Sequence, residues 1–335
     1  MAEEGIQAVT MPKWGLSMTQ GKVVGWLVAE GDRITKGMAL AEVETDKATG
    51  EVESAQEGVL RAIVAGPGDQ VLVGGTIALV APPEVPEEAV TAAAAEARNQ
   101  LASPEQGEEA GGAKVATVAV DGHTLAYGSI GEGPEAVVLV HGFGGDKDSW
   151  LFVQDPVADG RTVYALDLPG HGASDKDVGD ASLDHLARTV VGFLDQVGVE
   201  RAHLVGHSLG GAVVAAAGAA APSRVASLTL VAPAGFGQEV NHAYLRGFAQ
   251  ARSRRELKPW LSALFADDKL VTRQLVDDLL AYKRLDGVDA ALAALVTTLL
   301  DGDVQAIDTA SLLAKTSVPT VVVWGREDQV LPVSG

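Results

Sequence analysis

The chain has 335 residues, 47% of them hydrophobic and 21% charged, and a formal net charge of −20 at pH 7. This charge argues against nucleic-acid binding, which needs a basic face to displace counterions. The lack of cysteine excludes a disulfide framework, a thiolate metal site and a cysteine nucleophile, and the histidines show no metal-ligand spacing. No apolar run reaches the roughly 18–20 residues of a membrane span, and the acidic start does not match a signal peptide. We expect a cytoplasmic protein of about two domains.

Residues 6–81 are predicted to form a small β domain. Short apolar–polar alternations are cut by glycines and show no helical period. The pattern that begins at Gly31 returns in the segment that begins at Gly68. Two similar β units, each too short to bury a face alone, predict a two-fold sandwich. Between them, a polar tip flanked by alternating residues predicts a hairpin with Lys47 at its exposed end.

Residues 1–82 resemble a lipoyl domain. The resemblance rests on Asp46-Lys47-Ala48 at the hairpin tip and on the glycines Gly31 and Gly58 on either side of it. Biotinyl domains share the fold but usually flank their lysine with methionines, so this tip favours the lipoyl family. The resemblance implies lipoate in amide linkage on Lys47, whereas the lysine alone also fits an ordinary solvated hairpin. A long arm on a protruding lysine suits group transfer between separate sites.

Residues 83–113 are predicted to be a flexible linker rich in Pro, Ala, Glu and Gly. Few large apolar residues are present, so little can be buried to offset the entropy of ordering. Prolines and acidic self-repulsion should keep the segment extended, with at most a transient helix over residues 93–101.

Residues 114–335 are predicted to form a mostly parallel sheet under helices. Runs that are apolar throughout indicate strands buried on both faces, and Ser182 is expected to cap a helix over Leu183–Val197. Residues 236–312 interrupt the alternation with helical, mixed-charge sequence and are predicted to form a lid. The expected strands are Thr117–Val120, Thr124–Gly128, Ala136–Val140, Thr162–Leu166, Ala202–Val205, Val225–Val231 and Thr320–Trp324.

One stretch carries the chemistry, Gly206-His207-Ser208-Leu209-Gly210-Gly211, between the strand Ala202–Val205 and the alanine-rich run Ala212–Ala221. A G-x-S-x-G sequence between a strand and a helix is typical of a nucleophile elbow. The sharp turn would hold the Ser208 hydroxyl at the carboxyl edge of the sheet, with the Leu209 N–H directed at the reacting carbonyl. The alternative is a glycine-rich turn with an idle serine. The motif predicts acyl transfer through Ser208.

From about residue 115 the chain resembles the α/β-hydrolase family. The segment 140–145 follows the third strand, where the family takes a second oxyanion donor, which implies the Phe143 N–H. The segment 167–174 resembles a common structural loop of these enzymes. Trp324-Gly325-Arg326-Glu327-Asp328 ends the strand after the lid, where the triad acid belongs. Asp328 fits that position better than Glu327.

The family places its catalytic histidine after the acid. All seven histidines precede Asp328, and the sequence stops at Gly335. The resemblance therefore implies a C-terminally truncated chain without the last strand, the closing helix and the base, which would lie beyond Gly335. Such a chain should be nearly inactive in acyl transfer, although Lys47 should still be lipoylated. His141, His171 and His207 are expected to be structural residues or pocket walls.

A lipoyl domain joined directly to an α/β-hydrolase domain resembles the E2 components of acetoin dehydrogenase complexes. The resemblance implies a dihydrolipoyllysine-residue acetyltransferase that moves acetyl from S-acetyldihydrolipoyl-Lys47 to coenzyme A. It implies an oligomeric assembly with a thiamin-diphosphate-dependent E1 and a dihydrolipoamide dehydrogenase E3. A lipoyl-bearing hydrolase of esters or thioesters and a non-catalytic lipoyl carrier are the alternatives. The basic cluster at residues 252–255 either attracts coenzyme A phosphates or pairs with acids of the lid.

Overall fold

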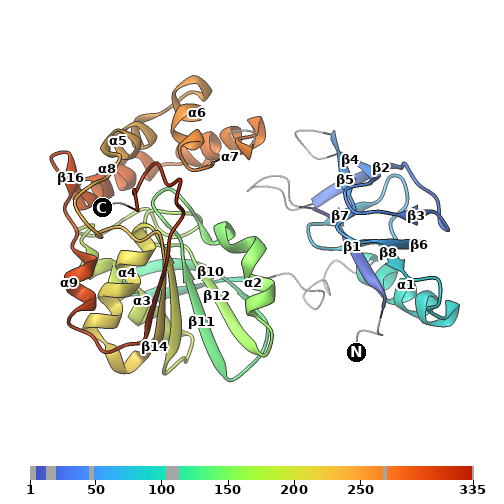
Figure 1. Ribbon diagram of the computed structural model, residues 1–335, viewed down its shortest axis with the longest axis horizontal. Helices are drawn as coiled ribbons and strands as arrows, with labels where there is room; N and C mark the ends of the chain where they lie inside the picture. The colour runs from blue at the N-terminus through green and yellow to red at the C-terminus, as the bar shows by residue number, and fades with distance from the viewer. Residues whose placement is uncertain (1–4, 13–19, 45–48, 103–112, 267–269, 334–335) are drawn as a thin grey trace. The chain divides into compact units, whose positions relative to one another are not determined.

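The computed structural model describes residues 5–12, 20–44, 49–102, 113–266 and 270–333, and divides into two compact units, Met1–Gly112 and Ala113–Gly335 (Figure 1). Lys47 lies outside the described residues. Within those ranges, no helix combines the length and the apolar character needed to cross a bilayer.

The first unit contains two four-stranded antiparallel sheets, ordered β1–β8–β6–β3 and β5–β4–β2–β7. The two halves of the unit contribute equivalent strands. Each strand in one sheet corresponds to a strand that comes from the other half of the unit and lies in the other sheet. The predicted two-fold β sandwich is therefore confirmed. The strands are β1 (Gln7–Thr10), β2 (Gln20–Trp26), β3 (Arg33–Ile34), β4 (Ala39–Glu44), β5 (Thr49–Glu53), β6 (Gly58–Ile63), β7 (Gln70–Leu72) and β8 (Thr76–Ala81).

The sequence repeat reappears as a repeat of hydrogen bonds. The Gly31 N–H donates to the Leu60 carbonyl at 2.7 Å, and the Gly68 N–H donates to the Val23 carbonyl at the same distance. Both glycines have positive φ, +95° and +100°, a conformation that costs a residue with a side chain about 1–2 kcal/mol. Each turn thus ties one half of the sandwich to the other.

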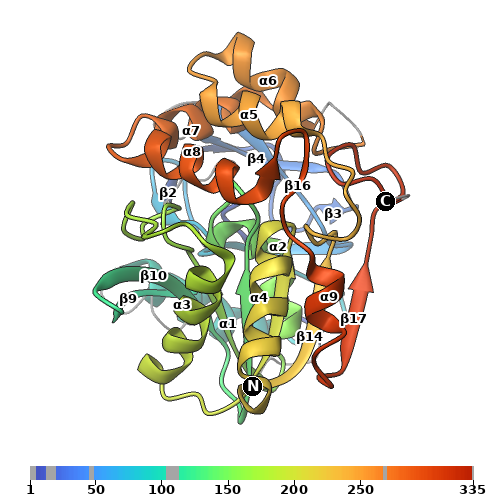
Figure 2. The same cartoon turned by 90° about the vertical axis from the view of Figure 1, so that its left-hand side faces the viewer.

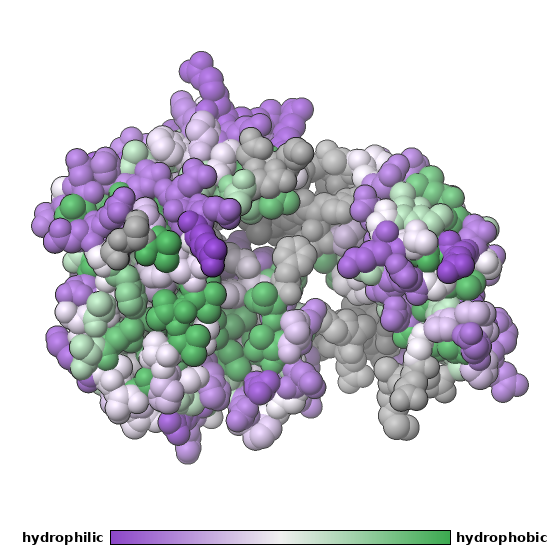
Figure 3. Space-filling view, viewed as in Figure 1, coloured by the Kyte–Doolittle hydropathy of each residue, from purple (hydrophilic) through white to green (hydrophobic). Residues whose placement is uncertain are grey.

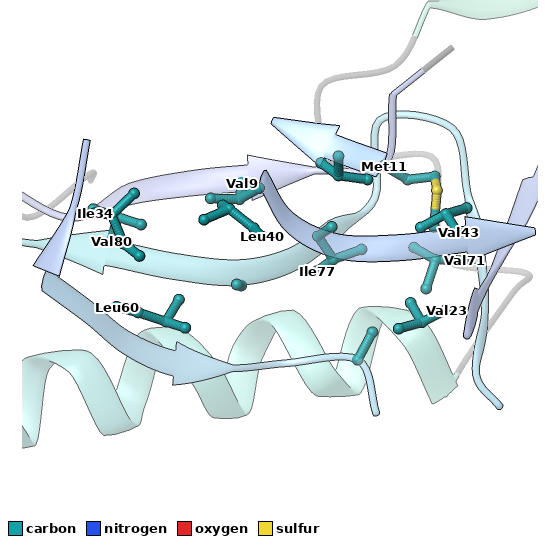
Figure 4. Close-up of a cluster of buried hydrophobic side chains, with 13 residues drawn as sticks. Val9, Met11, Val23, Ile34, Leu40, Val43, Leu60, Val71, Ile77 and Val80 are labelled. Carbon is teal, nitrogen blue, oxygen red and sulfur yellow. The ribbon is translucent and has the colours of Figure 1, made fainter. Parts of the chain in front are cut away.

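The core of this unit lies between the two sheets, where branched aliphatic side chains from both halves meet (Figure 4). Val23, Leu40, Val43 and Leu60 are fully buried. On β2 the buried residues alternate with exposed ones, as expected for strands with one face on a core. Burial of apolar surface is the main term that stabilises such a sandwich.

The linker prediction is wrong for residues 87–102, which form helix α1 (Glu87–Ala102). Its buried residues Val90, Ala94 and Ala97 recur every three or four positions and pack on Ala62 and Leu79, on the outer face of the sheet. Figure 4 shows α1 running alongside the strands. The composition argument failed because alanines can cover an apolar sheet face without large side chains. Residues 103–112 lie outside the described ranges.

The second unit is built on a seven-stranded sheet in the order β17–β14–β13–β11–β12–β10–β9. The pairs of β10 with β9 and with β12 are antiparallel, and the remaining pairs are parallel. All seven expected strands are present, with ends shifted by a few residues at most. They are β9 (Lys114–Val120), β10 (His123–Ile130), β11 (Glu135–Val140), β12 (Arg161–Leu166), β13 (Ala202–His207), β14 (Val225–Val231) and β17 (Thr320–Val323).

Helices cover both faces of this sheet. Figures 1 and 2 show α3, α4 and α9 on one face, α2 on the other, and α5–α8 grouped above the carboxyl ends of the parallel strands. The described helices and short strands are η1 (Lys147–Trp150), α2 (Leu151–Val157), α3 (Leu183–Gln196), α4 (Leu209–Ala220), η2 (Pro222–Arg224), α5 (His242–Gln250), α6 (Arg254–Ser262), α7 (Arg273–Lys283), α8 (Val288–Leu299), β15 (Leu300–Asp301), β16 (Val304–Gln305) and α9 (Thr309–Leu313).

Local sequence accounts for the start of α3. Ser182 caps α3 by accepting the His185 N–H at 3.1 Å, as predicted.

The predicted lid corresponds to α5–α8 and the β15–β16 hairpin. The last helix in the predicted range, α9, instead packs on α4. The lid helices therefore end earlier than the sequence predicted.

The edge strand β17 differs from the central strands. Its pairing partner among the described residues is β14 alone, and Val321, Val322 and Val323 are exposed. Figure 3 shows hydrophobic residues gathered on this side of the unit. Apolar edge strands of this kind are prone to pairing with other strands.

Candidate active site

Ser208 occupies a strained turn between β13 and α4. Its backbone has φ 52° and ψ −117°, a region that residues with side chains seldom adopt and that clusters at functional sites. Surrounding hydrogen bonds hold it there: the Ser208 N–H donates to the Val231 carbonyl, and the Ser208 carbonyl accepts from Gly211 and Ala234, each at 3.0 Å. The side chain stays partly accessible. This geometry is that of the predicted nucleophile elbow.

The glycines of the elbow are required by close backbone packing. A Cβ at Gly206 would collide with the Gly210 carbonyl, and a Cβ at Gly210 would collide with the carbonyl groups of Val140 and His141. Helix α4 is buried from Leu209 to Gly218. Its first turn therefore sits directly against the end of β11, which carries the candidate oxyanion loop.

That loop passes against the nucleophile. A Cβ at Gly142 would lie 3.0 Å from the Ser208 Cβ and 2.9 Å from the His207 Nδ1. Among the described residues, no protein acceptor pairs with the Phe143 N–H. The Leu209 N–H opens α4, where first-turn N–H groups have no intrahelical partner. Both candidate donors thus belong to segments that converge on Ser208, and their role as an oxyanion hole stays a prediction.

Two buried histidines fix the loops around the site. The Leu168 N–H donates to His141 Nε2, and the Gly144 N–H donates to His171 Nε2, both at 3.0 Å. Each Nδ1 therefore carries the proton, and these atoms donate to the Gly142 and Pro169 carbonyls. Burial lowers the pKa of His141, and burial followed by the charge of His141 lowers the pKa of His171 to about 3. Neither ring has a lone pair free to act as the base.

Asp167 has the structural role predicted for its loop. The carboxylate is fully buried and accepts the Lys147 N–H at 2.6 Å and the Ala173 N–H at 2.9 Å. The Ser174 hydroxyl donates to the Asp167 carbonyl at 2.7 Å. These bonds join the loop after β12 to the start of η1.

Asp328 lies in the turn after β17 and is held by its own chain. Its Oδ1 accepts the Val330 N–H at 2.9 Å and the Leu331 N–H at 2.8 Å. Trp324 Nε1 donates to the Leu331 carbonyl at 2.8 Å, which closes the turn. Glu327 is exposed, whereas Asp328 is half-buried. The role of Asp328 as the triad acid stays a prediction.

The charge of Asp328 reaches the elbow and the lid. His207 is exposed as a residue. Desolvation of its imidazole ring nevertheless lowers its pKa, and the Asp328 carboxylate opposes that shift. Burial, with the Asp328 charge adding to it, raises the pKa of Tyr244 on α5. Asp328 is therefore close enough in space for its charge to act on His207, which precedes Ser208, and on Tyr244 of the first lid helix.

The lid is fastened to the acid turn and packs on the oxyanion loop. The Asn241 N–H donates to the Val330 carbonyl at 2.8 Å just before α5. The ring of Phe248 lies 5.8 Å from that of Phe143 and 5.8 Å from that of Tyr244. The side chains of α5 thus form the wall of the site above Phe143.

The sequence analysis missed the lid residues that touch the site. Phe248 packs on Phe143, and the ammonium group of Lys283 lies 5.2 Å from the centre of the Phe248 ring. These residues come from α5 and α7, and no local motif links them. Of the basic cluster, Arg252 pairs with Asp289 at 2.6 Å and Arg254 pairs with Asp277. The acid-pairing alternative therefore holds for these two arginines.

Lys47 itself lies outside the described residues, but its flanking strands are described. β4 and β5 pair antiparallel, with Glu44 opposite Thr49 at the end of the ladder. The predicted hairpin is therefore present up to the residues that bound its tip. The attachment of lipoate to Lys47 stays a prediction.

Two family models match the chain. Residues 7–80 match the biotin-requiring enzyme (biotin/lipoyl) model, and residues 135–335 match the alpha/beta hydrolase fold model. The described α/β unit is similar to the crystal structure of a membrane phospholipase A, with a TM-score of 0.57 and 30% identity, covering 73% of this chain and 82% of that one.

Two curated relatives match nearly the whole sequence. The dihydrolipoyllysine-residue acetyltransferase component of the acetoin cleaving system of Cupriavidus necator is 46% identical, covering 97% of this chain and 87% of the relative. Its counterpart from Pseudomonas putida is 45% identical, covering 98% and 89%. The chain therefore belongs to the family of dihydrolipoyllysine-residue acetyltransferase components of acetoin-cleaving systems.

Proposed function

We propose that Ser208 relays an acetyl group from S-acetyldihydrolipoyl-Lys47 to coenzyme A. The observation that carries this proposal is the strained turn at Ser208, in a chain that also contains a lipoyl-type domain. Three backbone hydrogen bonds hold Ser208 in its strained conformation. The Ser208 hydroxyl is therefore positioned for attack before a substrate binds.

The chemistry proceeds in two acyl transfers, from the dihydrolipoyl thioester to the Ser208 ester and from that ester to the coenzyme A thioester. The Ser208 Oγ loses its proton to a base and attacks the thioester carbonyl; the C–S bond then breaks, and the dihydrolipoyl thiol leaves with a proton. The coenzyme A thiol next attacks acetyl-Ser208, which forms acetyl-coenzyme A and returns the proton to Ser208. The Phe143 and Leu209 N–H groups stabilise the oxyanion in both steps.

Asp328 orients the base in this scheme. The geometry of His141 and His171 excludes both as that base, because each Nε2 already accepts a backbone N–H. The family order of the triad places the base after Asp328 in the chain. An E1 that cleaves acetoin would load lipoyl-Lys47, and an E3 would reoxidise the arm, within the multienzyme assembly that the family implies.

Trapping the acyl-enzyme tests the proposal. The chain, extended past Gly335 by a segment that supplies the family's base, is incubated with S-acetyldihydrolipoamide without coenzyme A, quenched in acid and digested. The expected result is a peptide acetylated on Ser208 that disappears when coenzyme A is added, with acetyl-coenzyme A as the product. Ser208→Ala is the control. Release of acetate at the same rate with or without coenzyme A would assign the site to a hydrolase instead, and no acylation at all would refute the mechanism.

A further inference from the structure

The lid contains a cavity of about 430 Å³ lined by residues from the end of α5 to the α7–α8 turn. Figure 2 shows α5, α7 and α8 grouped together in the lid. Three cationic residues line it, Arg252, Lys283 and Arg284, together with two acids, Asp286 and Asp289. The remaining lining is apolar side chains and a glycine. The lining of the cavity therefore carries more positive than negative groups, in a chain with a net charge of −20. A second lid cavity, of about 460 Å³, is lined by Arg254, Arg255 and Lys258, but the buried ammonium of Lys283 belongs to the first.

Lys283 is the unusual member of this lining. Its side chain is 5% exposed, and its ammonium group donates to the Ala249 carbonyl at 3.0 Å, near the C-terminus of α5. An ammonium has three N–H donors, and no second hydrogen-bond acceptor contacts it among the described residues. A buried charge without enough partners is costly. An anion in the cavity would supply the missing partner.

The neighbouring charges leave room for such an anion. Arg252 is already paired with Asp289 at 2.6 Å, so these two groups largely neutralise each other. Lys283 and Arg284 remain, opposed by Asp286. Desolvation lowers the pKa of Lys283, the charge of Asp289 opposes this shift, and the charge of Arg252 adds to it. A bound phosphate would favour the charged ammonium and form charge-assisted hydrogen bonds with it.

The cavity is also linked to the candidate active site. The Lys283 ammonium lies over the Phe248 ring, and Phe248 packs on Phe143, which is the candidate oxyanion residue. A Cβ at Gly144 would collide with Phe248, so the aromatic ring rests directly on the oxyanion loop. A ligand with phosphates at one end and a thiol on a long flexible arm would fit this arrangement.

We propose that the cavity beside Lys283 and Arg284 binds the phosphate groups of coenzyme A, while its pantetheine arm passes Phe248 toward Ser208. This inference rests on the proposed transfer of acetyl to coenzyme A. It adds the location at which the acceptor is recognised, and it assigns Lys283 and Arg284 as specificity-determining residues for that acceptor.

Calorimetric titration of the full-length chain tests this binding site without requiring turnover. The wild type, Lys283→Met and Arg284→Gln are titrated with coenzyme A and with pantetheine, which lacks the phosphates. Lys283→Met keeps the aliphatic stem and removes the charge. Arg284 is exposed, so Arg284→Gln should fold even if the buried variant does not. Lys258→Gln removes an exposed charge that lines the second cationic lid cavity, and it is the control that tests whether the phosphates bind there instead.

The wild type should bind coenzyme A more tightly than pantetheine. Lys283→Met and Arg284→Gln should each weaken coenzyme A binding about tenfold or more, the usual effect of losing a charge-assisted hydrogen bond. Pantetheine binding and Lys258→Gln should show little change. Equal affinity of the wild type for the two ligands, or unchanged coenzyme A binding in both cavity variants, would overturn the inference.

A parallel assay separates this outcome from failure of the proposed function. In the chain extended past Gly335 by a segment that supplies the base, the wild type should transfer acetyl from S-acetyldihydrolipoamide to coenzyme A and to pantetheine. If this extended wild type transfers acetyl to neither acceptor, the proposed function fails while the binding result still stands by itself.

Discussion

Gly68 in the lipoyl-type unit and Gly210 in the hydrolase-type unit are required for opposite physical reasons. In the lipoyl-type unit, Gly68 adopts φ +100° and faces open space. In the hydrolase-type unit, Gly210 has no such φ, but a side chain there would collide with the backbone of β11. Gly68 supplies a backbone conformation at an open turn, whereas Gly210 allows two backbones to touch beneath Ser208. A side chain is therefore expected to be tolerated better at residue 68 than at residue 210.

Ser208→Ala should separate the two units most sharply. Because the acyl-enzyme cannot form, acetyl transfer should fall by about 10⁶-fold, as measured by the formation of acetyl-coenzyme A in a chain extended past Gly335 by a segment that supplies the base. Lipoylation of Lys47, read from intact mass, should be unchanged. The complementary variant Lys47→Ala should lose lipoylation and retain transfer from free S-acetyldihydrolipoamide. Loss of both functions in either variant would contradict independent sites.

Asp328→Asn should have the next largest effect. Asparagine keeps the Oδ1 acceptor for the Val330 and Leu331 N–H groups, so the turn should persist, but the negative charge is lost. In a chain extended past Gly335 by a segment that supplies the base, we expect about a 10⁴-fold drop in kcat with little change in melting temperature. Glu327→Gln, at the exposed neighbour, is the control and should retain activity. If Glu327→Gln is the inactive variant, the acid has been assigned to the wrong residue.

Gly210→Ala tests the close packing of the elbow. The added methyl group would collide with the Val140 and His141 carbonyls, so the helix or the strand must shift. We expect a loss of about 3 kcal/mol in the free energy of unfolding of this unit, measured with urea, and a lower transfer rate. Gly210→Asn should destabilise the unit at least as much as Gly210→Ala. The cost at residue 210 comes from the volume of the added side chain and not from a positive φ.

His171 should make the stability of the hydrolase-type unit depend on pH. Its pKa falls from 6.5 to about 3 in the folded state, so the unfolded chain binds the extra proton between these values and stability is lost as pH falls below 6.5. The raised pKa of Asp146, about 6 because of burial and the charges of Asp148 and Asp167, acts in the opposite direction between pH 3.8 and 6.

The variant His171→Gln isolates the contribution of this histidine, since Asp146 is common to both proteins. The stability difference between wild type and variant should shrink by about 1.4 kcal/mol for each pH unit between 6.5 and 4.5. Urea unfolding at several pH values measures this difference. A constant difference would mean that the pKa of His171 is the same in the folded and unfolded protein.

Gly68→Ala should have the smallest effect. The cost is that of placing a side chain at positive φ, about 1–2 kcal/mol, and Gly68→Asn should recover part of it because asparagine tolerates this region. Urea unfolding of the lipoyl-type unit measures both changes. If Asn is no better than Ala at residue 68, the contrast between the two kinds of glycine would fail.

Local patterns in the sequence determined much of this protein. The repeat at Gly31 and Gly68, the alternating strands and the seven strands of the α/β unit all follow from periodicity and turn chemistry, which act over a few residues. The elbow at Ser208 was predictable for the same reason, because its glycines and its flanking strand and helix are contiguous. The helix α1 was not predictable from composition, because its alanines are stabilised by the outer face of a sheet formed elsewhere in the chain.

Only the tertiary structure decided which residues surround the nucleophile. The ring-nitrogen hydrogen bonds that exclude His141 and His171 as the base involve Leu168 and Gly144, from other loops. The contact of Lys283 with Phe248, and of Phe248 with Phe143, joins three elements that no sequence spacing relates. Such contacts depend on how packed elements meet in space. A sequence pattern indicates which face of a helix or strand is buried. It does not indicate which side chains from other elements contact that face.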